Sequence, residues 1–96
     1  MDIEFVDDAD ASRFELRAGD EVIGFLDYRL RDDHITMVHT EVDAAHSGHG
    51  YAAVLARGAL DDARSRGLRV VPSCPYVASY IQKHPEYADL VASEDR

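Results

Sequence analysis

The sequence predicts an α+β fold for residues 1–96, a mostly antiparallel sheet with the element order ββββ-α-β-α in a minimal single domain. Three observations predict it. Apolar and polar residues alternate through the first half of the chain, and beyond residue 51 apolar residues recur at spacings of three and four instead. Turn residues separate the segments, and 96 residues with 46% hydrophobic content suffice for one thin core.

The first half is expected to form four strands, over residues 3–6, 12–18, 21–30 and 34–42. Gly19-Asp20 supplies a hairpin turn between the second and third strands, and residues 31–33 supply the next turn. Because each turn is tight, consecutive strands pair in antiparallel fashion and form a meander.

The second half is expected to begin with a helix that ends near Arg66, followed by Gly67 as its C-terminal cap. Its apolar stripe is rich in alanine, so this helix can lie close to a sheet. A fifth strand over 68–71 and a last helix over 76–83 follow, with Pro75 at the first helical position. The apolar stripe comprises Ala52, Leu55, Ala56, Ala59, Leu60 and Ala63.

Acidic residues are concentrated in the first half of the chain. Residues 1–48 contain 13 acidic and 4 basic residues, while residues 49–96 contain 6 of each. This distribution argues against nucleic acid as a ligand, since phosphate binding needs clusters of lysine and arginine. It leaves two interpretations open: an acidic face that attracts a cationic amine, or an ordinary solvated surface.

Cys74 is the only cysteine, so it cannot form an internal disulfide, and we expect a cytoplasmic protein. No apolar run approaches the ~20 residues that a membrane-spanning helix needs, so no membrane partner is expected.

The segment from Ser47 to Ala52 joins the fourth strand to the long helix and contains Gly48 and Gly50. Glycines allow close approach to the backbone, and the first-turn amides of a helix have no internal acceptor. The loop therefore has two interpretations: a cradle for a phosphate or pyrophosphate, or an ordinary helix-start loop.

Three segments together resemble the GCN5-related N-acetyltransferase (GNAT) family, and in particular a very short uncharacterised branch of it. They are the strand Val38–Val42, the loop Gly48-x-Gly50-x-Ala52, and the C-terminal signature from Val70 to Tyr87. Ser47 stands where the family pattern has Arg or Gln, and Asp43 replaces a proline that is common in the branch.

The resemblance implies a GNAT-like fold and an acyl-CoA-dependent N-acetyltransferase that moves acetyl from acetyl-CoA to a primary amine. No extra helices fit between the first two strands, so the amine site should be open, which favours a protein lysine or N-terminus over a metabolite. The implied contacts to the cofactor come from Val42, Ser47, Gly48, His49, Gly50, Tyr51, Ala52 and Ser73.

Four residues are candidates for catalysis. His39 and Glu41 share one face of the fourth strand, and either could take the proton from the ammonium group. Cys74 could accept the acyl group, because the N-terminus of a helix favours a thiolate, or it could line the pocket as a small buried residue. Tyr80 resembles the tyrosine that protonates the departing thiolate in many relatives, or it packs against the sheet.

No metal is expected. His34 and His39 are five residues apart and so face opposite sides of a regular strand, and the spacing of His46, His49 and Cys74 does not suit a structural zinc site. We expect a monomer or weak homodimer. The alternative function is a non-catalytic acyl-CoA-binding module that acts through a protein partner.

Overall fold

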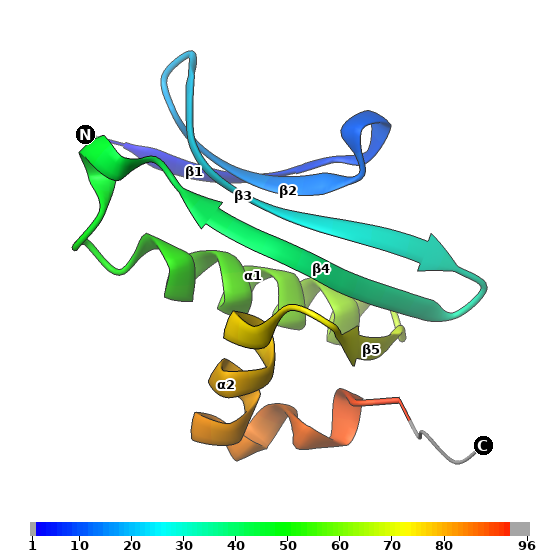
Figure 1. Cartoon of the computed structure of the whole chain (residues 1–96). Helices are drawn as coiled ribbons and strands as arrows, with labels where there is room; N and C mark the ends of the chain where they lie inside the picture. The colour runs from blue at the N-terminus through cyan, green and yellow to red at the C-terminus, as the bar shows by residue number, and fades with distance from the viewer. Residues whose placement is uncertain (1, 93–96) are drawn as a thin grey trace.

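The computed structural model describes residues 2–92, and its elements follow the predicted order ββββ-α-β-α (Figure 1). Three short 3-10 turns, η1, η2 and η3, were not predicted. The strands are β1 Ile3–Asp8, β2 Arg13–Ala18, β3 Glu21–Arg31, β4 His34–Val42 and β5 Arg69–Pro72. The helices are α1 Tyr51–Ser65 and α2 Pro75–Lys83, and the turns are η1 Ala9–Ala11, η2 Ala44–His46 and η3 Pro85–Leu90.

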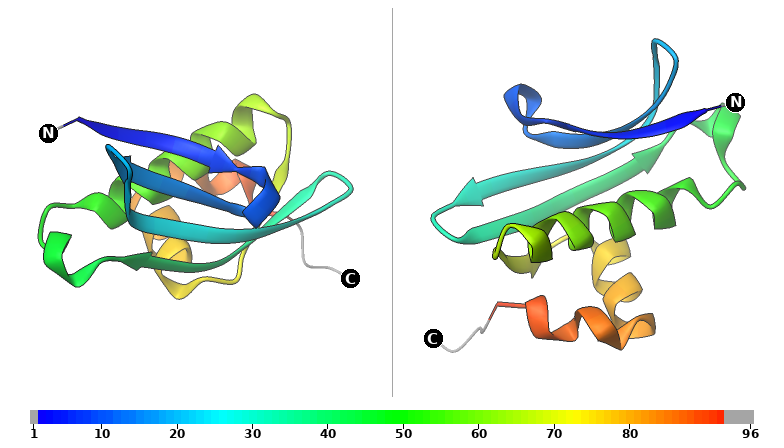
Figure 2. Two further views of the ribbon diagram at one scale, coloured as in Figure 1. Left: turned by 90° about the horizontal axis from the view of Figure 1, so that it is seen from above. Right: turned by 180° about the vertical axis from the view of Figure 1, so that it is seen from behind.

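The five strands form one sheet in the order β1-β2-β3-β4-β5. The first three pairings are antiparallel, and the β4–β5 pairing is parallel because α1 carries the chain back between them. Both helices lie on the same face of the sheet, and within residues 2–92 the other face carries no helix (Figures 1 and 2). The predicted mostly antiparallel α+β fold is confirmed.

The core lies between the sheet and α1. The predicted small-residue stripe of α1 faces the sheet, and this allows the helix to approach closely. Gly58 shows how close the approach is, since a Cβ atom at this position would lie 2.7 Å from the ring of Phe5 in β1. The fully buried side chains include Phe14, Leu16, Leu26, Ile35 and Met37 from the sheet and Leu55, Ala56, Ala59, Leu60 and Ala63 from α1.

A β-bulge in β4 changes which side chains share a face. Asp27 pairs with His39 and Tyr28 pairs with Met37, so Val38 is an extra residue in β4. His34 pairs with Arg31, and β3 alternates regularly from Asp27 to Arg31, so His34 and His39 lie on the same face. The expectation that they face opposite sides was wrong, because it assumed an unbroken alternation along β4.

The helix-free face contains one buried carboxylate, Glu15 of β2, which is 2% exposed. Arg13 and Arg17 flank it in the same strand and donate hydrogen bonds of 2.7 Å to its two oxygens. Burial alone would raise the pKa of Glu15, but the two arginine hydrogen bonds outweigh it and hold that pKa below its ordinary value. The guanidinium of Arg13 also lies over the ring of Phe25, 4.8 Å from its centre.

The C-terminal segment returns to the sheet. Gly67 follows α1 with a φ of +69°, as expected for a helix-terminating glycine. Beyond η3, Val91 forms an isolated parallel bridge with Val70 of β5, a contact that the sequence did not predict. Within residues 2–92, no helix is long and apolar enough to cross a membrane.

Candidate active site

The predicted loop leads directly into the N-terminus of α1. Gly48 and Gly50 adopt φ values of +86° and +76°, the left-handed region that glycine tolerates best. Gly50 is the N-cap residue, and no side chain caps this helix end. The first helical hydrogen bond runs from the amide of Val54 to the carbonyl of Gly50, so the amides of the preceding first turn are free to bind an anion.

A groove of about 190 Å³ follows this loop. Six of the eight residues predicted to contact the cofactor line it: Val42, Ser47, Gly48, Gly50, Tyr51 and Ala52. The lining also includes His46, Ala53 and Tyr76, which the sequence reasoning missed. Tyr76 follows Pro75 at the start of α2, and burial, with a smaller effect of Tyr80, raises its pKa.

The two other predicted cofactor residues lie outside the lining of this groove. The ring of His49 stacks on that of Tyr51, with ring centres 5.5 Å apart. Ser73 lies in the turn after β5, where its amide donates a 3.0 Å hydrogen bond to the carbonyl of Val71.

A fork opens where β5 leaves β4. The pairing of the two strands ends at Met37 and Pro72, and the amide of Cys74 then donates a 2.8 Å hydrogen bond to the carbonyl of Met37. Within the part of the chain that the structure describes, no strand pairs with this side of β4 beyond Met37. The backbone edge of residues 38–42 is therefore open to an extended ligand.

Cys74 lies inside this fork and is 3% exposed. Its Sγ lies 3.4 Å from the Oγ1 of Thr40, close enough for a weak hydrogen bond with either atom as donor. Thr40 was not among the predicted site residues. Its position between His39 and Glu41, which places it on the opposite face of β4, was the signal that could have identified it.

His39 and Glu41 both lie on the helix-free face. Their spacing of two residues along β4 predicted that they would share a face. The Nε2 of His39 is 3.1 Å from the Oε1 of Glu41, and both side chains are more than half exposed. The structure therefore brings these two residues together with each other, and it places them on the other side of β4 from Thr40, which contacts Cys74.

Tyr80 lies in the second turn of α2 and is 9% exposed. Its ring stacks on the imidazole of His84, with ring centres 4.0 Å apart and an interplanar angle of 17°. The rings of Tyr76 and Tyr87 lie within 6.5 Å and 6.2 Å of it. Among residues 2–92, no hydrogen bond joins Tyr80 to Cys74.

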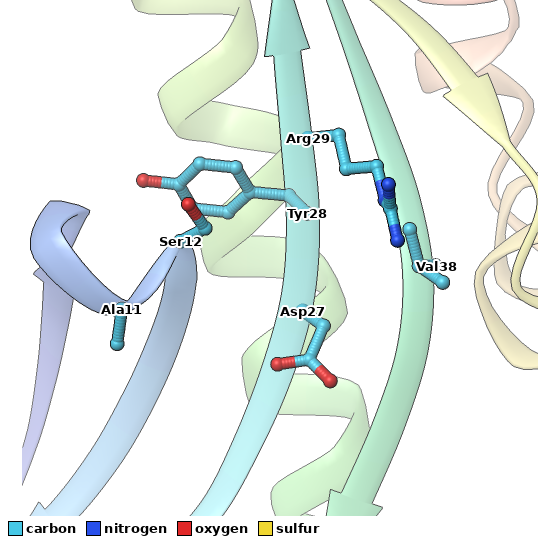
Figure 3. Close-up of a pocket in the computed structure, with 6 residues that line it drawn as sticks. All are labelled: Ala11, Ser12, Asp27, Tyr28, Arg29 and Val38. Atoms are coloured by element: carbon cyan, nitrogen blue, oxygen red, sulfur yellow. The ribbon is translucent and has the colours of Figure 1, made fainter.

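Besides a hollow of about 530 Å³ at Ser12, Leu30 and Thr36, two further hollows border the sheet. The first, of about 350 Å³, lies where η1 meets β2 and the bulged part of β3 and β4 (Figure 3). Its lining, which includes Ser12, Asp27 and Arg29, contains none of the predicted site residues. The second, of about 220 Å³, is lined by Phe25, Glu41 and Asp43 and lies at the C-terminal end of β4.

Comparison with known proteins agrees with this arrangement. The model of the GCN5-related N-acetyl-transferase family matches residues 13–90, so the chain belongs to this family. Membership supports acetyltransferase activity, and acetyl-CoA is the general co-substrate of the family.

Two solved structures have the same fold. The NMR solution structure of a GCN5-like protein from Staphylococcus aureus is 21% identical, with a TM-score of 0.68 over 99% of this chain and 91% of the other. The crystal structure of a ribosomal-protein-alanine N-acetyltransferase from Brucella melitensis biovar Abortus 2308 is 22% identical, with a TM-score of 0.58 over 88% of this chain and 63% of the other.

Proposed function

We propose that this protein transfers the acetyl group of acetyl-CoA to a primary amine of another protein, a lysine side chain or an N-terminus. The observation that carries the proposal is the fork between β4 and β5. Val42 lines the loop groove, and Cys74 lies at the point where the two strands part, so one open strand edge leads from the groove toward the thiol.

The proposed binding mode uses backbone groups. The pyrophosphate accepts hydrogen bonds from the amides of residues 48–52 and gains from the positive end of the α1 dipole. The pantetheine arm pairs with the free edge of β4 as an added strand does. Ser47 donates its hydroxyl to the carbonyl of Ala44, 3.1 Å away, so it supports the loop.

In the proposed reaction, the neutral amine attacks the thioester carbonyl from the helix-free face. A new C–N bond forms, the C–S bond breaks, and the CoA thiolate leaves and takes up a proton. The contact between His39 and Glu41 supports a role for this pair in removing the proton from the ammonium group. We propose Tyr80 as the donor to the thiolate.

Cys74 has two possible roles in this scheme. In direct transfer its thiol contacts the thioester end, together with the hydroxyl of Thr40. In a two-step route its thiolate attacks the thioester carbonyl, the CoA thiolate leaves, and Cys74 carries the acetyl group as a thioester until the amine attacks and the Cys74 thiolate is released. An intact-mass measurement after mixing with acetyl-CoA separates the routes, because only the two-step route yields a hydroxylamine-labile acetyl adduct.

The preference for a protein amine rests on access and charge. No helix in the described part of the chain covers the face that carries His39 and Glu41, so a large substrate can approach it (Figure 2). Asp27 pairs with His39 across the two strands, so two carboxylates, Asp27 and Glu41, lie next to His39. These carboxylates favour a cationic substrate.

The first test is calorimetric titration with CoA and acetyl-CoA. We expect micromolar binding that Gly50→Asp weakens by at least about tenfold, because a new carboxylate would repel the pyrophosphate. Gly19→Asp is the matched control. Gly19 also has a positive φ and open space around it, but it lies in the β2–β3 hairpin turn and not in the loop. An equal loss in both variants, or no binding by the unaltered protein, would contradict the proposed cradle.

The second test measures acetylation of lysine peptides. Cys74→Ala is expected to lower kcat by about 10²-fold or more, with CoA affinity little changed. Binding without turnover, together with indifference to Cys74→Ala, would support the non-catalytic acyl-CoA-binding module instead. Efficient acetylation of free small amines with no action on peptides would contradict the proposed substrate class.

A further inference from the structure

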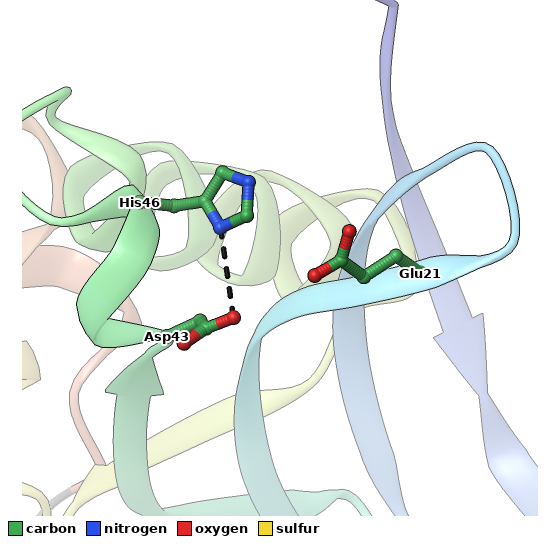
Figure 4. A group of neighbouring side chains, drawn as sticks. All are labelled: Glu21, Asp43 and His46. Atoms are coloured by element: carbon green, nitrogen blue, oxygen red, sulfur yellow. Dashed lines mark ion pairs between the residues drawn. The ribbon is translucent and has the colours of Figure 1, made fainter.

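Three side chains that could ligate a metal converge at the end of the sheet next to η2: Glu21, Asp43 and His46 (Figure 4). Glu21 opens β3, Asp43 follows β4, and His46 ends η2. Their nearest carboxylate oxygens and the imidazole nitrogen all lie within 4.8 Å of one another. Asp43 and His46 are three residues apart in sequence, and the antiparallel pairing of β3 with β4 brings Glu21 to them.

The imidazole of His46 is the observation that points to a ligand. Its Nδ1 atom is buried and has no hydrogen-bond partner within residues 2–92. The Oδ2 of Asp43 forms the ion pair drawn in Figure 4 at 3.6 Å, beyond the usual range of an N–H···O hydrogen bond, and the His46 side chain as a whole is 20% exposed. A buried polar atom without a partner is costly, and its position between two carboxylates suggests that a cation satisfies it.

The backbone holds this geometry in place. The amide of Asp43 donates a 2.8 Å hydrogen bond to the carbonyl of Ile23, which ties the end of β4 to the start of β3. The Oδ1 of Asp43 accepts a 3.3 Å hydrogen bond from the amide of Ala45. This bond orients the carboxylate so that its other oxygen, Oδ2, faces His46.

The charges and distances fit one ion. Among the described residues, neither Glu21 nor Asp43 forms an ion pair with an arginine or lysine, so His46 is the only cationic partner that the described residues offer to the two carboxylates. Two ligands bound to zinc at about 2.1 Å in tetrahedral geometry lie about 3.4 Å apart. The observed 3.6 Å between His46 and Asp43 is close to this separation.

We propose that Glu21, Asp43 and His46 bind a divalent transition-metal ion of the Zn²⁺ type, with water completing the coordination. One imidazole and two carboxylates are ligands that such ions accept, whereas Ca²⁺ and Mg²⁺ favour sets made only of oxygen. The expectation of no metal considered only the histidines and the thiol, and it overlooked Glu21 on another strand. The proposal does not depend on acetyl transfer.

The test is calorimetric titration of the metal-free protein with ZnCl₂, together with its melting temperature with and without Zn²⁺. We expect one equivalent to bind with micromolar affinity and to raise the melting temperature. Glu21→Gln and His46→Asn should each weaken binding by at least about tenfold, by removing one ligand.

Asp20→Asn and His49→Asn are the matched controls, since they alter neighbouring residues that lie outside the cluster, and they should bind Zn²⁺ like the unaltered protein. Absence of binding, or binding that survives both cluster variants unchanged, would overturn the proposal. Tighter binding of Ca²⁺ or Mg²⁺ than of Zn²⁺ would overturn the choice of ion.

Discussion

The two faces of the sheet differ in the kind of side chain that they bury. One face is covered by α1, and the side chains between them are apolar and fully buried. The other face carries no helix among the described residues, and the charged side chains of Arg13 and Arg17 cover a buried carboxylate at Glu15 there. The same strands therefore carry an apolar core on one side and an ion-pair network on the other.

This difference matches the proposed function, in which the covered face supports the cofactor site and the open face admits the substrate. The covered face supplies the stability that fixes the start of α1 and its loop, which the proposed cofactor site needs. The open face leaves His39 and Glu41 accessible to a large substrate. Since truncating a fully buried apolar side chain leaves a cavity, whereas replacing Glu15 only weakens two hydrogen bonds, the two faces should respond unequally to mutation.

The largest effect is expected on the covered face. Leu60→Ala should lower the free energy of unfolding by about 3 kcal/mol, because Leu60 is fully buried and its truncation leaves a cavity. Urea denaturation measures the change. Leu30→Ala is the matched control, since Leu30 is 46% exposed, and it should cost little. Similar losses of unfolding free energy at both positions would contradict the expected difference between core and surface.

A smaller effect is expected at the carboxylate of the open face. Glu15→Gln should lower the free energy of unfolding by about 2 kcal/mol, because two hydrogen bonds from arginines to a charged acceptor are weakened. Glu4→Gln, at an exposed position of the neighbouring strand β1, is the control and should change little. If Glu15→Gln proved neutral, the ion-pair network would not stabilise this face.

The pH dependence of the unfolding free energy tests the contribution of Glu15 to the open face. Because the pKa of Glu15 is lower in the folded state than in the unfolded state, its contribution is fully present above the unfolded value of about 4.3. The contribution disappears as pH falls through the folded value. The difference in unfolding free energy between the unaltered protein and Glu15→Gln should therefore shrink below about pH 4. A difference that stayed constant down to pH 2 would contradict this account.

The smallest effect is expected where a polar group anchors η3 to α1. The hydroxyl of Tyr87 donates a 2.7 Å hydrogen bond to Asp61, and burial together with this bond raises the pKa of Tyr87 to about 12. Tyr87→Phe should lower the free energy of unfolding by about 1 kcal/mol, since only the hydroxyl is lost. Tyr76→Phe is the control. A loss of unfolding free energy as large as that of Leu60→Ala would mean that η3 contributes more to the stability of the fold than its packing suggests.

The candidate site was partly predictable from the sequence. The glycine loop and Cys74 were found because glycine spacing and a lone cysteine before a proline are local signals. Thr40 and Tyr76 were missed, because their importance comes from the fork and the groove, which form only when β4, β5 and α2 meet. The roles of His39, Glu41, Cys74 and Tyr80 stay predictions.

The sequence by itself determined the order of the elements, the Ala-rich face of α1 and the glycine loop, since alternation, helical spacing and turn residues act over a few neighbouring residues. Only the tertiary structure decided the bulge at Val38, the burial of Glu15 and the meeting of Glu21 with His46. The physical reason is that strand register and long-range contacts depend on the packing of the whole sheet, which no local pattern contains.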